Sequence, residues 1–150
     1  MPYSNFTQQR VFIVGTGSLL DEGITHLLTL VTDLQVSYAK YSDDFAFLEN
    51  IQRIWPDVIL VSQDGSLDSA HILDLLSSHP AALRSRIIIV QLHSTVVDIY
   101  DRPTLVAGKM SRGLQQIMVR ARDDLLNAVH DIPFRFKVSD RVLAVKDLYS

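Results

Sequence analysis

The apolar residues of this chain follow two spacings, and the change from one to the other predicts its first elements. Residues 11–14 form an unbroken apolar run, which is typical of a strand buried on both faces. The apolar residues that come next have the spacing of one helical face: Leu20, Ile24, Leu27, Leu28 and Val31. Residues 10–31 are therefore predicted to form a strand, a tight turn and an amphipathic helix.

The alternation of strand and helix patterns continues through residue 90. Residues 34–39 alternate between apolar and polar, whereas residues 58–61 (VILV) and 87–90 (IIIV) are continuous apolar runs. Helical patterns lie between these strands, and one of them ends at Pro56, because proline cannot continue the helical hydrogen-bond ladder. This order predicts a parallel sheet that is covered by helices on both faces.

The segment over residues 92–116 allows two interpretations. Residues 96–100 and 104–107 both have strand-like patterns, and the turn-forming residues 101–103 between them would complete a hairpin. A helix that contains residues 96–100 is the alternative. Both interpretations stay open on the sequence alone.

The rest of the chain predicts one more strand, a final helix and an extension. Residues 117–119 predict a short strand, and a helix follows from Arg122. Apolar and polar residues then alternate over residues 134–138, which indicates an edge strand, although a helix from Ser139 onward is the alternative. We therefore expect a lead-in over residues 1–9, one domain over residues 10–131 and a C-terminal extension over residues 132–150.

Composition limits the compartment and the partners. The 150 residues are 47% hydrophobic, enough for one domain with its own core, and the absence of cysteine excludes disulfides and thiolate metal sites. No apolar stretch approaches the ~20 residues that cross a bilayer, so we expect a cytoplasmic protein with no membrane contact. A net charge of −3 without a dense basic block disfavours direct binding of nucleic acid.

Three stretches resemble the receiver domain of bacterial two-component response regulators, over residues 10–131. VFIVGTGSLLDEGITHLL, from Val11, is similar to the first strand and helix of that family. PDVILVS, which ends at Ser62, is similar to the segment that ends in the phosphorylated aspartate, and RDDLLNAV is similar to the final helix. The resemblance implies a flavodoxin-like α/β fold, (βα)5, with a doubly wound, five-stranded parallel sheet in three αβα layers, followed here by the C-terminal extension.

The resemblance also implies where the chemistry of a receiver would lie, and there this sequence departs from the family. Receivers hold Mg²⁺ with two carboxylates after the first strand and the acceptor aspartate after the third. A hydroxyl after the fourth strand and a lysine after the fifth bind the phosphoryl group. The residues at these positions are Gly15, Thr16, Ser62, Gln91 and Arg120, with Lys109 as an alternative register for the last. The pocket is thus predicted to have lost its carboxylates, its metal and its phosphoacceptor, and no cofactor is expected.

These departures predict a pseudo-receiver, a non-enzymatic signalling module that acts through protein contacts independently of aspartate phosphorylation. In receivers, the fourth helix, fifth strand and fifth helix usually form the dimer or contact the effector. We therefore expect a homodimer through residues 93–131 with help from the tail.

A nucleotide or phosphometabolite binder is the alternative function. The turn that leaves the first strand, Gly15, Thr16, Gly17 and Ser18, could present backbone N–H groups to an anion at a helix N-terminus. However, the third glycine of a G-x-G-x-x-G motif is missing, because position 20 is Leu20.

Overall fold

A computed structural model of the chain describes residues 8–63, 67–91 and 93–130. The C-terminal extension and most of the predicted lead-in lie outside the described residues. The elements in chain order are β2 (Gln9–Gly15), α1 (Leu19–Thr29), β3 (Leu34–Lys40), α2 (Asp44–Ile54), β4 (Val58–Gln63), α3 (Ser69–Ser77), the 3₁₀ turn η1 (Pro80–Ala82), β5 (Arg86–Gln91), β6 (Val96–Tyr100), β7 (Thr104–Val106), β8 (Lys109–Ser111), β9 (Leu114–Met118) and α4 (Arg122–His130). None of the helices in the described ranges combines the length and apolar character that crossing a bilayer requires.

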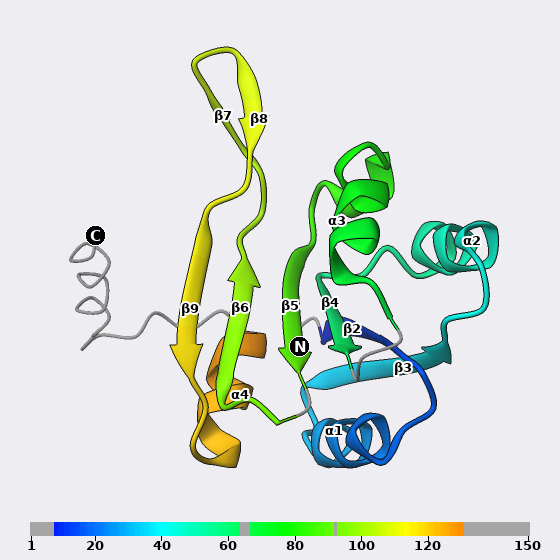
Figure 1. Cartoon of the computed structure of the whole chain (residues 1–150), viewed down its shortest axis with the longest axis vertical. Coiled ribbons are helices and arrows are strands. Elements are labelled where there is room, and N and C mark those ends of the chain that lie inside the picture. The colour runs from blue at the N-terminus through cyan, green and yellow to red at the C-terminus, as the bar shows by residue number, and fades with distance from the viewer. Residues whose placement is uncertain (1–7, 64–66, 92, 131–150) are drawn as a thin grey trace, which may run out of the picture.

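The main sheet has six strands in the order β3-β2-β4-β5-β6-β9 (Figure 1). The first four strands of this order are parallel, β6 runs antiparallel to β5, and β9 runs antiparallel to β6. Helices α1 and α4 pack on one face, and α2 and α3 pack on the other. The C-terminal ends of the four parallel strands therefore share one edge, where open α/β sheets place their binding sites.

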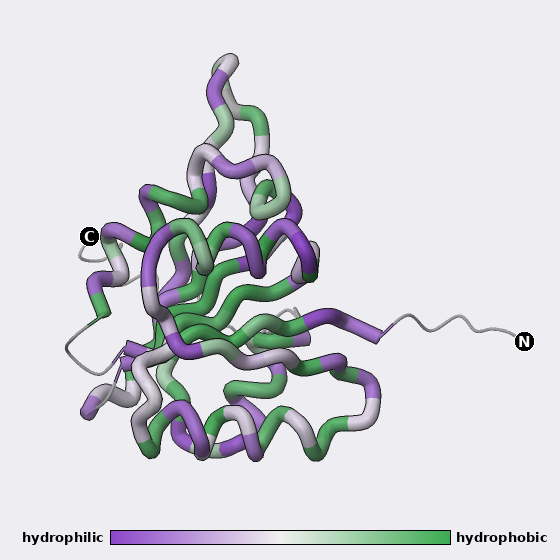
Figure 2. The backbone as a smooth tube through the Cα atoms, turned by 90° about the vertical axis from the view of Figure 1, so that its right-hand side faces the viewer, coloured by the Kyte–Doolittle hydropathy of each residue, from purple (hydrophilic) through white to green (hydrophobic). Residues whose placement is uncertain are grey.

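Each face of the sheet has its own hydrophobic core. The side chains of Val58 and Leu60 point into the core beneath α1 and α4, whereas Ile59 and Val61 point into the core beneath α2 and α3, and all four are fully buried. Figure 2 shows the central strands as hydrophobic between helices of mixed character. Continuous apolar runs were predicted for strands buried on both faces, and β4 and β5 confirm that pattern.

The α/β class with a mostly parallel sheet is confirmed, but the number of strands and the direction of one strand differ from the prediction. Residues Val96–Tyr100 form a strand, not the alternative helix, and this strand takes the place beside β5 that a fifth parallel strand would occupy. Val97 and Ile99 are β-branched residues that favour extended backbone, and their side chains are buried in the core beneath α4. An antiparallel strand therefore replaces the helix expected between β5 and β9.

The hairpin predicted between residues 96–100 and 104–107 is wrong in its pairing. Strand β7 pairs with β8 instead, and Ala107 and Gly108 form the turn with φ angles of 51° and 80°. Positive φ at both central residues is what the tight hairpin turn of type I′ requires. The β7–β8 hairpin projects beyond the sheet at the N-terminal edge of the parallel strands (Figure 1).

Helix caps and stops follow the sequence closely. Asp43 and Asp68 accept backbone N–H groups as the N-caps of α2 and α3. Helix α2 ends before Pro56, as predicted, with Trp55 in the left-handed region at a φ of 51°. The N-termini of α2 and α3 are thus fixed at the C-terminal edge of the sheet.

Candidate functional site

The C-terminal ends of β2 and β4 lie side by side in the centre of the sheet. Val14 pairs with Val61, so the next residues, Gly15 and Ser62, are neighbours at this edge. Both are buried, and none of the Ser62 surface is exposed. The structure thus brings together two of the positions predicted to line the degenerate pocket.

A carboxylate lies beside Gly15, and it comes from α1 instead of the strand end. A Cβ atom placed on Gly15 would lie 2.2 Å from Oδ2 and 2.3 Å from Oδ1 of Asp21. A Cβ atom does not approach non-bonded atoms so closely, so the Asp21 side chain fills the space that a side chain on residue 15 would need. Only 1% of Asp21 is exposed. The prediction of a pocket without carboxylates is therefore wrong, because one carboxylate enters it from the helix.

Four groups donate hydrogen bonds to the Asp21 carboxylate. Oδ2 accepts the Gly17 N–H at 2.7 Å, the Tyr38 hydroxyl at 2.7 Å and the Ser18 N–H at 3.3 Å, while Oδ1 accepts the Ser18 hydroxyl at 3.1 Å. The Asp21 N–H donates in turn to Ser18 Oγ at 3.3 Å, which completes a capping box. Gly17 adopts a φ of 90°, a conformation that favours glycine. The carboxylate is thus held at the positive end of the α1 dipole.

The surroundings of the Asp21 carboxyl group determine whether it is charged. Burial raises the pKa of the Asp21 carboxyl, but polar contacts with Ser62, Tyr38, Gly17 and Ser18 outweigh burial and place the pKa below its usual value. Within the described residues the Ser62 oxygen has no partner of regular hydrogen-bond geometry, so its contact with Asp21 is a weak one. Burial, followed by the hydrogen bond to Asp21, raises the pKa of Tyr38 to about 12. A charged carboxylate therefore faces a neutral phenol near neutral pH.

The remaining predicted pocket residues are spread along the sheet. Thr16 is half-buried in the turn after β2, and Gln91 is exposed at the end of β5, where it pairs with Gln63. Arg120 follows β9, and strands β5 and β6 lie between β9 and β4. Because neighbouring strands are about 4.8 Å apart, the inserted β6 moves the end of β9 one strand farther from Ser62 than a five-stranded order would.

The contacts of Arg120 agree with this separation. Its Nε lies 3.1 Å from Sδ of Met118, and its backbone N–H donates to Asp124 at 2.8 Å. Lys109, the alternative register, is exposed on β8 of the projecting hairpin. Neither Arg120 nor Lys109 therefore lies at the end of a strand next to β5, where the resemblance to receivers would place the lysine.

The donor set at this pocket does not fit the magnesium ion of a receiver. Magnesium needs several oxygen ligands in near-octahedral geometry, and Asp21 supplies one carboxylate that already accepts four hydrogen bonds. Among the residues that the structure describes, no group of three or more acidic or histidine side chains could hold a metal.

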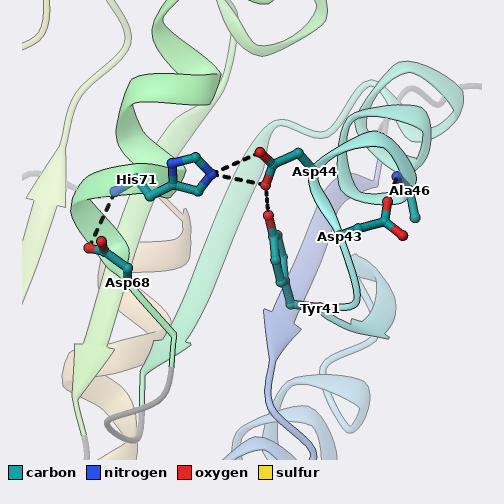
Figure 3. A network of polar contacts seen from close by, with 6 residues as sticks. All are labelled: Tyr41, Asp43, Asp44, Ala46, Asp68 and His71. Atoms are coloured by element: carbon teal, nitrogen blue, oxygen red, sulfur yellow. Dashed lines mark hydrogen bonds and ion pairs between the residues drawn. The ribbon is translucent and has the colours of Figure 1, made fainter.

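A second polar cluster lies at the same edge, between α2 and α3 (Figure 3). The Asp44 carboxylate accepts a hydrogen bond from the Tyr41 hydroxyl, and both of its oxygens lie 2.9 Å from Nε2 of His71. The side chains of Asp44 and His71 are each 47% exposed. Such exposed pairs contribute at most about 1 kcal/mol to stability. The cluster therefore joins the N-termini of α2 and α3, and its exposure distinguishes it from a buried reactive pair.

Asp21 is the residue that pattern reasoning at the strand ends misses. Its spacing from Ser18, S-x-x-D, is a capping signal, and Gly15 before it leaves room for a side chain to reach the strand end. These two signals together could have indicated that the carboxylate turns back over β2. Neither one alone distinguishes it from an ordinary first-turn acid.

Comparison with known proteins gives a partial likeness, which comes from solved structures. No family model matches the chain, and no curated protein matches it. Among solved structures, the chain is similar to the signal receiver domain of NarL from Mycobacterium tuberculosis, at 25% sequence identity and a TM-score of 0.45. The match covers 59% of this chain and 69% of that chain.

Proposed function

We propose that the chain is a receiver-like regulatory module of the cytoplasm that signals through protein contacts, without enzymatic activity and without aspartate phosphorylation. Two features of the chain support the module class. The strands β3-β2-β4-β5 follow the order 2-1-3-4 that begins a flavodoxin-like sheet. The sequence that forms them carries the stretches similar to receivers.

The surroundings of Ser62, the residue at the acceptor position, are the main support for the proposal. Ser62 is fully buried, and the charged Asp21 carboxylate stands beside it. A phosphoryl group on Ser62 would add negative charge next to this carboxylate, and two like charges 4 Å apart repel by about 4 kcal/mol at an effective dielectric of 20. Among the described residues, no group of three or more acidic or histidine side chains is placed to bind a neutralising magnesium ion. Transfer of a phosphoryl group to this position is therefore strongly opposed.

Phosphoryl donors provide the direct test. Incubation of the full chain with acetyl phosphate and Mg²⁺ should leave its intact mass unchanged, because the described part of the pocket lacks a ligand set for the metal and has Ser62 at the acceptor position. Beryllofluoride with Mg²⁺ should leave its amide NMR spectrum unchanged for the same reason. An active receiver domain treated in parallel is the positive control. A stoichiometric phosphoryl adduct on Ser62, or on Asp64 two residues later, would contradict the proposal.

For the contact surface we propose the part of residues 93–131 that has no covering helix. Val97, Ile99 and Ile117 point toward the core beneath α4, so alternate residues of β6 and β9 point to the opposite face. Large apolar side chains exposed there and on the hairpin are Val96, Leu105, Met110, Leu114 and Met118, with 38% to 71% of their surface accessible. A row of this kind is typical of an interaction site, and we propose that a second copy of the chain covers it.

Charge placed on this surface should dissociate the homodimer. The double substitution Leu114→Lys with Met118→Lys is expected to weaken association more than about tenfold, because each ammonium would have to be desolvated in an apolar contact. Analytical ultracentrifugation of the full chain measures the effect. Leu19→Lys is the matched control, since Leu19 is 83% exposed on α1, far from this surface in the fold. A wild-type chain that stays monomeric at high micromolar concentration would refute the dimer.

The contacts of Asp21 weigh against the alternative of a phosphate site in the turn of residues 15–18. The N–H groups of Gly17 and Ser18, which would face a phosphate, already donate to the Asp21 carboxylate. Lys40 lies near Gly17 and adds a positive charge, but an incoming anion would still have to displace a charged side chain. We therefore do not propose nucleotide binding at this turn.

A further inference from the structure

A groove of about 510 Å³ lies at the N-terminal edge of the parallel strands, opposite the edge that holds Asp21. Arg10 and Gln35 are paired residues near the starts of β2 and β3. Asp57 directly precedes β4, and Arg84 lies two residues before β5. Arg102 comes from the chain after β6, and it reaches this edge because β6 runs antiparallel to its neighbour. The inserted strand thus delivers one of the basic residues of the groove.

Hydrogen bonds hold the basic groups in place. Asp57 accepts the Arg10 backbone N–H at 2.8 Å through one oxygen and the Arg84 guanidinium at 2.6 Å through the other. Nε of Arg102 donates to the backbone carbonyl of Arg84 at 3.1 Å. Both guanidinium groups are therefore fixed at the lining of one groove. The side chain of Arg10 makes no hydrogen bond or ion pair with another described residue, and its donors remain available to a ligand.

The charge of this groove contrasts with that of the whole chain. Among the described residues of its lining, three guanidinium groups stand against one carboxylate, whereas the chain as a whole carries −3. Arg86 and Arg112 lie at the same edge but donate to the chain itself, Arg86 to Ala128 and Asp101, and Arg112 to backbone carbonyls. The groove is thus a local positive site that the overall composition conceals.

We propose that this groove binds the phosphate groups of a small polyphosphate. Guanidinium groups pair with phosphate oxygens through two parallel hydrogen bonds, and the amide of Gln35 adds a neutral donor beside them. The volume lies in the range of small-ligand sites, about 300 to 1,000 Å³, and exceeds the needs of a single phosphate ion. The site shares no residue with the Asp21 pocket, so it stands or falls separately from the proposed function.

Titration of the isotope-labelled full chain with tripolyphosphate at low salt tests the site. We expect saturable changes in the amide NMR signals of Arg10, Gln35 and Arg102, with those of Gly17 and Ser18 unchanged. Orthophosphate should bind more weakly, because it fills only part of the groove. Added salt should weaken binding, because the charges lie at a solvent-exposed edge.

Two substitutions distinguish specific binding of tripolyphosphate in the groove from nonspecific attraction to any exposed arginine. Arg10→Gln should weaken tripolyphosphate binding about tenfold, which corresponds to losing hydrogen bonds to a charged group, and it should leave the fold intact. Arg53→Gln is the control, since Arg53 is exposed on α2 and lies outside the groove. Within the described ranges, its side chain donates a hydrogen bond only to the neighbouring Asn50. Absence of saturation at millimolar tripolyphosphate, signal changes centred on residues 15–18, equal binding of orthophosphate, or equal weakening by Arg53→Gln would each overturn the proposal.

Discussion

Replacing Asp21 with alanine is expected to lower the free energy of unfolding by about 2–3 kcal/mol, since it removes a capping box and leaves partly buried donors unpaired. The groups that lose their acceptor are the N–H groups of Gly17 and Ser18 and the Tyr38 hydroxyl. Urea unfolding followed by circular dichroism measures the change. Glu22→Ala is the control, because Glu22 is exposed in the same helical turn, and it should change stability by less than about 0.5 kcal/mol.

The structure predicts that this effect is coupled to Gly15. In the wild-type chain, Gly15→Ala would place a methyl group 2.2 Å from the Asp21 carboxylate and force it out of its contacts. With Asp21→Ala in place, the three atoms nearest to this methyl group, all of them in the carboxyl group, are removed. The double variant should therefore be about as stable as Asp21→Ala alone, with a coupling of about 2 kcal/mol.

A second glycine tests whether the cost at Gly15 comes from this contact. Gly23 lies within α1, and a Cβ atom there would meet nothing within 4 Å. Gly23→Ala should therefore stabilise the chain by about 0.5–1 kcal/mol through helix propensity. If Gly15→Ala and Asp21→Ala were additive, the carboxylate would not occupy the place of residue 15, and the account of the acceptor pocket would fail with it.

The pH dependence of the Asp21→Ala effect has a definite sign. The pKa of Asp21 in the folded chain lies below the ordinary value of 3.8, so the folded state favours the charged form. The stabilisation is complete above the unfolded pKa and is lost as the pH falls through the folded pKa. The stability difference between wild type and Asp21→Ala should accordingly be constant near neutral pH and shrink below about pH 4.

The strands and helix caps could be read from the sequence because their signals are local. The VILV run of β4 and the IIIV run of β5 are buried on both faces, and Asp43 and Pro56 mark the ends of α2. Such signals depend on the residue itself and its near neighbours. They fix the first four strands and three helices without any knowledge of the tertiary structure.

The content of the pocket could not be read in this way, because it depends on contacts across the fold. Aligning strand ends assigns residue 15 to the pocket and leaves Asp21 on a helix, yet the Asp21 side chain turns back over Gly15 and meets Tyr38 on β3. The place of Arg120 also depends on a distant feature, since it is β6 that separates β9 from β5. A short apolar run such as residues 96–100 fits a strand or a helix, and its packing under α4 decides between them.

Arg86 is the polar side chain whose loss should destabilise the C-terminal half most. It begins β5, only 7% of it is exposed, and alternation along the strand turns it toward the face that α4 covers. One guanidinium nitrogen donates to the Ala128 carbonyl at 2.7 Å, and the other bonds Asp101 at 2.8 Å. A single side chain thus joins β5 to the last turn of α4, at the negative end of its dipole, and to the residue after β6.

Substitution Arg86→Met should lower the free energy of unfolding by about 3 kcal/mol, because a buried carbonyl and a carboxylate lose their charged donor while the aliphatic volume is kept. Arg84→Met is the matched control: its ion pair with Asp57 is half-exposed, so its loss should cost less than about 1 kcal/mol. Hydrogen exchange should show the amides of α4 losing protection in Arg86→Met while those of β4 keep theirs, because β4 is held by both cores and α4 depends on one face. Equal costs for the two substitutions, or uniform loss of protection, would mean that Arg86 does not anchor α4 to the sheet.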